Sequence, residues 1–159
     1  MPASRVVAVL GLILMLTSVS GAQDRAPWVG IWRLDPARGT QGSTPSPYKR
    51  VTLSIASQDE ELRVTYDMVA TRGGVTHREW TGRLDGRDYP MQGVDYVMTN
   101  AYRLVNERSY EIAVKMEGNA VATAVATVSP DGSTLMVVTR ERDARGQPTE
   151  STAVYTRVR

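Results

Sequence analysis

The sequence predicts an all-β fold, in which an antiparallel up-and-down meander closes into a β-barrel of about eight to ten strands. Apolar and polar residues alternate with a period of two over most of the chain, as in strands with one buried face. Turn-forming pairs separate these segments at intervals of roughly 7 to 14 residues, which is typical of successive hairpins. The 159 residues contain no internal repeat or linker. We therefore expect one barrel domain over residues 23–159, preceded by a signal helix.

Residues 1–22 form the predicted cleaved signal peptide. Arg5 supplies a positive charge, residues 6–16 are an uninterrupted apolar run, and Ser20-Gly21-Ala22 provides a small-residue cleavage site. The apolar run is shorter than the roughly 20 residues of a membrane-spanning helix. The chain has no Cys, which excludes a lipid anchor attached at a cysteine. We expect a periplasmic or secreted protein with no stable membrane span after cleavage.

The predicted strands follow in chain order. The first lies within residues 28–35, and residues 35–47 are rich in Pro and Gly, which indicates either an excursion over one mouth of the barrel or a flexible connector. Alternation then predicts strands over 48–56, 62–68, 77–81, 95–104, 110–116 and 154–158. The predicted turns are Asp59-Glu60, Gly73-Gly74, Asp85-Gly86, Gln92-Gly93, Asn106-Glu107, Gly118-Asn119 and Asp131-Gly132.

The beginning of the predicted mature chain carries a recognisable motif. Gly30, Trp32, Leu34, Asp35, Pro36, Ala37 and Arg38 stand in a Gly-x-Trp-x-Leu-Asp-Pro-Ala-Arg segment, followed by Asp-Gly-Arg-Asp-Tyr-Pro at 85–90 and Ser-Pro-Asp-Gly at 129–132. This pattern resembles small exported bacterial proteins that are lipocalin-like, within the calycin superfamily. The resemblance implies a closed barrel in which a basic residue near the carboxyl end, here Arg157, stacks on Trp32.

Three residues are therefore structural candidates for closing the barrel. Trp32 is large enough to plug one end, and Gly30 allows another chain segment to approach closely. A guanidinium over an indole contributes roughly 0.5–2 kcal/mol. We expect Gly30, Trp32 and Arg157 to act together in this way, although direct contact with a ligand is the alternative.

The alternation also predicts an inner wall. Its tentative ligand-contacting members share the inward parity of their strands, and Arg78 and Asn100 are the polar exceptions. An inward arginine needs either an inner carboxylate or a bound one. The alternative is a filled core from which Arg78 extends to water. The predicted cavity-lining residues are Tyr66, Met68, Arg78, Trp80, Tyr96, Met98, Asn100, Tyr102 and Tyr110, with Ile112 beside them.

Several classes of function are disfavoured. With Arg5 removed, 18 basic residues face 17 acidic ones, and their interspersed charges do not form the basic stripe that binds nucleic acid. His77 is the only His, and no nucleophile motif accompanies any Ser, so we expect no catalytic residues, metal or cofactor.

The preferred hypothesis is an exported carrier of a small hydrophobic or amphipathic molecule. Tyr and Met are frequent and Phe is absent, so the predicted wall combines apolar surface with hydroxyl groups. The alternative is a non-enzymatic structural or interaction module of the cell envelope, with a filled barrel and unidentified protein partners.

Overall fold

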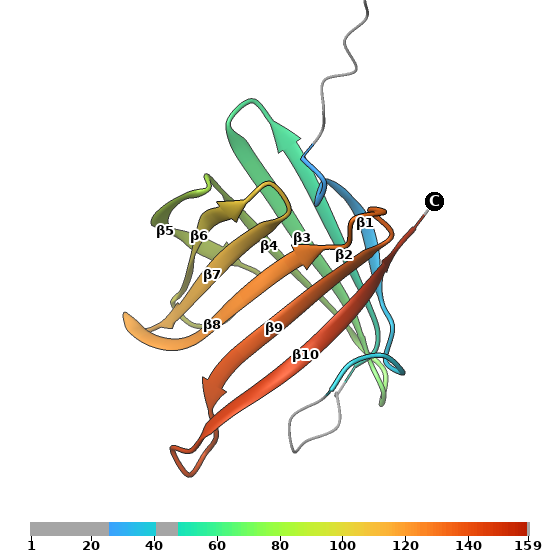
Figure 1. Ribbon diagram of the computed structural model, residues 1–159. Coiled ribbons are helices and arrows are strands. Elements are labelled where there is room, and N and C mark those ends of the chain that lie inside the picture. The colour runs from blue at the N-terminus through green and yellow to red at the C-terminus, as the bar shows by residue number, and fades with distance from the viewer. Residues whose placement is uncertain (1–25, 41–47, 159) are drawn as a thin grey trace, which may run out of the picture.

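The computed structural model describes residues 26–40 and 48–158 and contains ten strands (Figure 1). The predicted signal helix and cleavage site of residues 1–22 lie outside the described residues. The strands are β1 (Gly30–Leu34), β2 (Tyr48–Gln58), β3 (Glu61–Ala70), β4 (Val75–Gly82), β5 (Asp85–Gln92), β6 (Met98–Asn106), β7 (Ser109–Met116), β8 (Asn119–Val128), β9 (Thr134–Arg142) and β10 (Pro148–Arg157).

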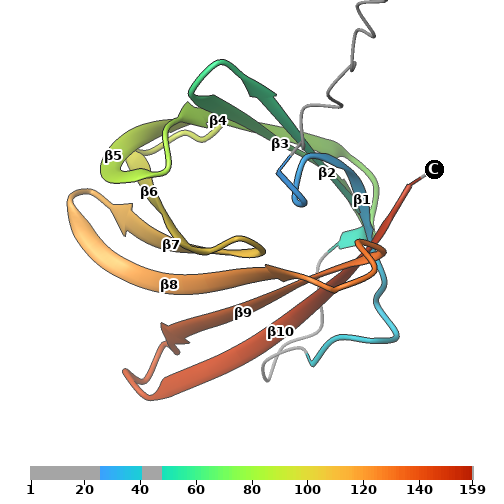
Figure 2. The ribbon, with the colours of Figure 1, turned by 45° about the horizontal axis from the view of Figure 1, so that its top comes forward.

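All ten strands form one closed antiparallel barrel. Each pairs with its neighbours in sequence, and β1 pairs with both β2 and β10, so the sheet has no free edge. Figure 2 shows the resulting ring of strands. The predicted all-β meander and its closure are confirmed, and the number of strands is at the upper end of the expected range.

The two-residue periodicity explains which faces are buried. In β2, Val51, Leu53 and Ile55 are buried, whereas the residues between them are more exposed. Leu53 pairs with Trp32 of β1 on one side and Tyr66 of β3 on the other. Because paired residues project to the same side of a sheet, the apolar faces of consecutive strands meet inside the barrel.

The connections gather at two ends of the barrel. Residues 26–29 and the loops after β2, β4, β6 and β8 lie at one end. The loops after β1, β3, β5, β7 and β9 lie at the other, which includes the β9–β10 hairpin in the lower part of Figure 1. The turn-forming pairs of the sequence do not predict the turn between β9 and β10.

The described part of the irregular stretch, residues 35–40, packs along β10. The Asp35 amide donates to the Val154 carbonyl at 2.8 Å, and the Thr152 amide donates to the Thr40 carbonyl at 2.8 Å. Gly39 lies so close to the β10 backbone that an added Cβ would be 2.5 Å from the Thr152 carbonyl oxygen. This segment is therefore held against the barrel at the end where β1 finishes.

The β4–β5 contact is the least regular seam. Its register includes only the pairs Glu79–Gln92 and Trp80–Met91. Beyond them, the Tyr89 ring covers Gly82, where an added Cβ would lie 2.6 Å from the ring. The predicted turn at Asp85-Gly86 was wrong, because these residues begin β5 and the connection precedes them. An aromatic side chain thus closes the seam where the ladder is short.

Within the described residues, we find no helix with the length and apolar character needed to cross a membrane.

Candidate functional site: the barrel cavity

The barrel encloses a cavity of about 670 Å³, to which all ten strands contribute side chains. Residues 35–40 and the beginning of the β9–β10 loop also line it, so it opens at their end of the barrel. This volume is within the roughly 300–1,000 Å³ of small-molecule sites. The interior is a cavity and not the filled core of the alternative prediction.

Tyrosines and methionines dominate one part of the wall. Tyrosine combines an apolar ring with a hydroxyl that needs a partner when buried, and methionine adapts to irregular shapes. The wall is thus apolar but carries several hydrogen-bonding groups. The members of this set are Tyr48, Tyr66, Tyr102, Tyr110 and Tyr155, with Met68, Met91 and Met98.

Four aromatic rings form a row across the interior. Trp80 and Tyr102 are stacked with their ring centroids 3.9 Å apart, and Tyr102 and Tyr110 are stacked at 5.5 Å. Trp28 meets Tyr110 edge to face at 5.4 Å. Tyr102 and Tyr110 line the cavity while Trp28 and Trp80 do not, so the row joins the cavity wall to the core around it.

The buried tyrosines are held in their neutral form. Burial raises the pKa of Tyr155 to about 12 and raises the pKa values of Tyr66, Tyr102 and Tyr110 above the ordinary value for a phenol. The physical cause is the loss of hydration that a phenolate would suffer. Their hydroxyl groups therefore stay protonated at neutral pH and are available as hydrogen-bond donors.

Three buried polar atoms near this wall have no hydrogen-bond partner within the part of the chain that the structure describes. They are Nε of Arg78, Oδ1 of Asn100 and the hydroxyl of Tyr102, and all three residues line the cavity. An unsatisfied buried polar group costs about 1–3 kcal/mol, and more if it is charged. These unsatisfied atoms are themselves covered, so they lie within the cavity wall and not on its open surface.

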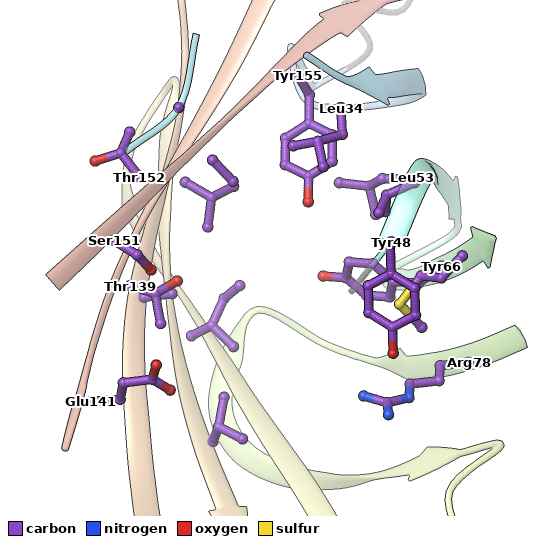
Figure 3. Close-up of a pocket in the computed structure, with 18 of the residues that line it drawn as sticks. Leu34, Tyr48, Leu53, Tyr66, Arg78, Thr139, Glu141, Ser151, Thr152 and Tyr155 are labelled. Atoms are coloured by element: carbon purple, nitrogen blue, oxygen red, sulfur yellow. The ribbon is translucent and has the colours of Figure 1, made fainter. Parts of the chain in front are cut away.

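The opposite wall is formed by β9 and β10 and is rich in hydroxyl groups. Thr139 pairs with Ser151, and Glu141 pairs with Thr149. All four residues line the cavity toward its mouth. Figure 3 shows Thr139, Ser151 and Glu141 on one side of the cavity and Tyr48, Tyr66 and Arg78 on the other. The two walls differ in chemistry, which gives a bound molecule a preferred orientation.

The far end of the barrel is closed by Trp32 and Arg157. Trp32 is fully buried, and the Arg157 guanidinium lies 4.1 Å from its ring centroid. Arg157 also donates to the carbonyls of Pro27, Val29 and Gly132. An added Cβ on Gly30 would lie 2.4 Å from Arg157 Nη1, so the glycine leaves room for the guanidinium. The stacking implied by the family resemblance is present.

Most of the predicted lining residues do face the cavity. Trp80 and Tyr96 are not among the lining residues. Trp80 is fully buried but lies behind Tyr102 rather than on the wall, and Tyr96 is 40% exposed. Tyr96 precedes β6, which begins at Met98, so the strand alternation does not extend to it. The residues found on the wall are Tyr66, Met68, Arg78, Met98, Asn100, Tyr102, Tyr110 and Ile112; their contact with a ligand remains a prediction.

The polar wall and part of the aromatic one are not predicted by the sequence pattern. Thr139, Glu141 and Ser151 alternate regularly along β9 and β10, but polar residues on a strand ordinarily indicate its outward face. Tyr48 and Tyr155 were assigned to strands without an orientation. The signal available for Tyr155 was its separation by two residues from Arg157, since this spacing places both on one face.

His77 does not belong to the cavity. Its Nδ1 lies 2.8 Å from Asp67 Oδ1, and both side chains are more than half exposed on the outer surface. Across the described ranges, no cluster of three or more His, Cys, Asp or Glu side chains is suited to a metal ion. The candidate site is therefore the cavity, and the geometry favours binding.

By sequence, the chain matches no protein-family model and no curated protein. Solved structures share its fold. Zebrafish ileal bile acid-binding protein complexed with cholic acid is 9% identical, with 83% of this chain and 99% of that chain covered and a TM-score of 0.53. Rv2717c from M. tuberculosis is 16% identical, with 84% and 94% covered and a TM-score of 0.53.

Lobster apocrustacyanin A1 is 12% identical, with 85% of this chain covered and a TM-score of 0.47; the chain spans 63% of the length of that protein. The fold is lipocalin-like, and the low identities carry the likeness no further than the fold.

Proposed function

We propose that the barrel binds and carries a small hydrophobic or amphipathic molecule. The observation that carries this proposal is the cavity of about 670 Å³, open at one end and lined by apolar and aromatic side chains with a few polar groups. This combination is typical of small-molecule sites. The zebrafish structure of the same fold is complexed with cholic acid, an amphipathic molecule, which is in keeping with such a role.

The proposed setting is the periplasm or the extracellular space. The support is the predicted signal peptide of residues 1–22. Expression of the full chain in a bacterial host should yield a secreted or periplasmic protein that begins at Gln23, as determined by amino-terminal sequencing. Recovery of the uncleaved chain from the cytoplasm would contradict export without affecting the binding proposal.

Binding is tested with N-phenyl-1-naphthylamine, a neutral dye that becomes fluorescent in apolar surroundings. We expect saturable binding by the wild-type protein. Val137→Trp should weaken it about tenfold or more, because the indole would occupy the cavity. Met136→Trp is the matched control: the neighbouring residue of β9 is 42% exposed and does not line the cavity, so dye binding should not change.

Native mass spectrometry of the protein purified from its own host gives an independent test. We expect a mass above that of the polypeptide, lost on denaturation, from a retained small molecule. A bare polypeptide mass together with no dye binding by wild type would contradict the carrier proposal. That result, with protein partners recovered on purification, would favour the alternative of a structural or interaction module.

A further inference from the structure

We propose that the molecule carried in the barrel is an organic anion with an apolar body, and that its acid group lies inward on Arg78. This inference rests on the proposed binding function and specifies the chemistry of that same cavity. It is carried by Arg78 and by the polar groups beside it on β3 and β6.

Arg78 is the only basic side chain among the described residues that line the cavity. Its guanidinium points from β4 into the interior (Figure 3), and its Nε is buried with no hydrogen-bond partner among the residues that the structure describes. No ion pair involves Arg78 in the described ranges of the chain. Arg78 as a whole is only partly buried, so its unpaired charge is accessible to an anion bound in the cavity.

Other arginines of the sheet form ion pairs with carboxylates on neighbouring strands. Arg63 forms an ion pair with Glu79 of the adjacent strand at 2.6 Å, and Arg140 pairs with Glu150 at 2.8 Å. These pairs lie on the outer surface. Arg78 instead stands opposite Tyr66 in the β3–β4 register, so its nearest cross-strand neighbour provides a hydroxyl and no charge. The cavity does have the carboxylates Asp35, Glu141 and Asp143 at its mouth, but none of them forms an ion pair with Arg78 in the described part of the chain.

Two further groups complete an anion-binding arrangement. Tyr66 and Asn100 are close enough to Tyr102 to perturb its pKa, which burial raises. These two residues lie beside the Tyr102 hydroxyl, but among the described residues neither that hydroxyl nor Asn100 Oδ1 has a partner in full hydrogen-bond geometry. Turning the Asn100 amide by 180° would present its N–H groups at the position of Oδ1. Arg78, Tyr102 and Asn100 then all supply donors, and a carboxylate, sulfate or sulfonate supplies only acceptors.

The mouth of the cavity determines which way the anion faces. Its acidic residues Asp35, Glu141 and Asp143 lie at the open end, so an acid group is repelled there and attracted inward. The hydroxyls of Thr139 and Ser151 face the remaining body of the ligand and can bind polar substituents on it. The ligand class is therefore an amphipathic organic acid bound with its acid group inside.

The first test needs no variant. Dodecanoate and dodecanol have the same alkyl chain and differ in charge. In displacement of N-phenyl-1-naphthylamine from the wild-type protein at pH 7.5, dodecanoate should bind about 10- to 100-fold more tightly than dodecanol, the range expected of a charge-assisted hydrogen bond. Equal affinities would overturn the inference. Failure of the neutral dye itself to bind would instead count against the proposed function.

The second test identifies the residue. Arg78→Met should remove the preference for dodecanoate over dodecanol, with both affinities measured on the same variant, since an apolar chain of similar length replaces the arginine. Arg87→Met is the matched control: Arg87 has a side chain 83% exposed on the outer surface, and its loss should leave the preference intact. Preserved preference in a folded Arg78→Met protein would overturn the assignment.

Arg78→Lys is a second variant, which keeps the result interpretable if Arg78→Met does not fold. It retains the charge but loses the guanidinium fork, so we expect a preference for dodecanoate between those of wild type and Arg78→Met. A lysine variant that binds both compounds equally, while remaining folded by near-ultraviolet circular dichroism, would contradict an electrostatic role for this position.

Discussion

At the scale of single residues, the closed end of the barrel depends on the contact between Trp32 and Arg157. The guanidinium lies over the indole and donates to three carbonyls, two of them in the segment that precedes β1. The indole N–H donates to the Trp28 carbonyl at 2.8 Å. One aromatic residue thus ties the first strand, the last strand and the preceding chain together. A point charge such as lysine cannot replace a planar fork with several fixed donors.

Trp32→Ala should lower the free energy of unfolding by about 3–5 kcal/mol, because it removes a fully buried ring and leaves a cavity. Trp32→Phe should cost about 1–2 kcal/mol, since it keeps an aromatic ring but loses the hydrogen bond to Trp28. Urea unfolding followed by circular dichroism measures both. A loss below about 1 kcal/mol for the alanine variant would contradict the role of Trp32 as the plug.

At the scale of elements, the β4–β5 seam depends on close packing more than on the ladder. Gly93 follows β5 with φ of 79°, and an added Cβ would lie 2.1 Å from the His77 carbonyl oxygen of β4. The loop after β5 therefore lies directly against the β4 backbone. The absence of a side chain at Gly93 allows this close approach, at a point where β4 and β5 share few paired residues.

Gly93→Ala should destabilise the protein by roughly 2–4 kcal/mol, through the clash with His77 and an unfavourable backbone conformation. Gly118→Ala is the matched control, because Gly118 has φ of 78° and nothing within 4 Å of an added Cβ. It should cost only about 1–2 kcal/mol from the backbone conformation. Thermal unfolding compares the two, and equal losses would argue against close packing at Gly93.

The β8–β9 loop provides a second test at this scale. Asp131 accepts hydrogen bonds from the Ser129 hydroxyl and from the amide and hydroxyl of Ser133, which lower its pKa to about 2. The pKa of Asp131 is lower in the folded protein than in the unfolded chain. The stability contributed by its ionised carboxylate is therefore present above about pH 4 and lost as the pH falls toward 2.

Asp131→Asn should therefore lower the melting temperature at pH 6, and the difference from wild type should disappear by about pH 2. Asp95→Asn, at an exposed position in the β5–β6 loop, is the control for the loss of a surface carboxylate elsewhere in the barrel. A difference for Asp131→Asn that is constant from pH 6 to pH 2 would rule out the ionised carboxylate as its origin.

At the scale of the whole molecule, alternation predicted the barrel because half of each strand faces one continuous interior. The same pattern placed Tyr66, Arg78 and Tyr102 on the cavity wall. It could not place Thr139 or Ser151, because an inward polar residue has the same periodicity as an outward one. Nor could it show that Arg78 lacks a carboxylate, since that depends on the register that sets Tyr66 opposite it.

The enclosed tyrosines also make the stability of the barrel sensitive to alkaline pH. Tyr102, Tyr110 and Tyr155 are at most 8% exposed, and burial raises the pKa of each, that of Tyr155 to about 12. Unfolding exposes these phenols to water, where they ionise near pH 10. Their contribution to stability is therefore complete below pH 10 and is lost as the pH rises through the folded values.

At pH 11, each such tyrosine should cost the folded state about 1.4 kcal/mol relative to pH 8, and three should cost about 4 kcal/mol. This approaches the lower end of the total stability of small domains, so the wild-type barrel should be much less stable at pH 11 than at pH 8. Urea unfolding at pH 8 and pH 11, with phenolate absorbance followed in parallel, measures the effect.

Tyr155→Phe should lose about 1.4 kcal/mol less than wild type between the two pH values, because one ionising group is removed while its ring is kept. If wild type and Tyr155→Phe lose equal stability, or if the Tyr155 phenol ionises while the barrel remains folded, the burial of the Tyr155 phenol would be contradicted.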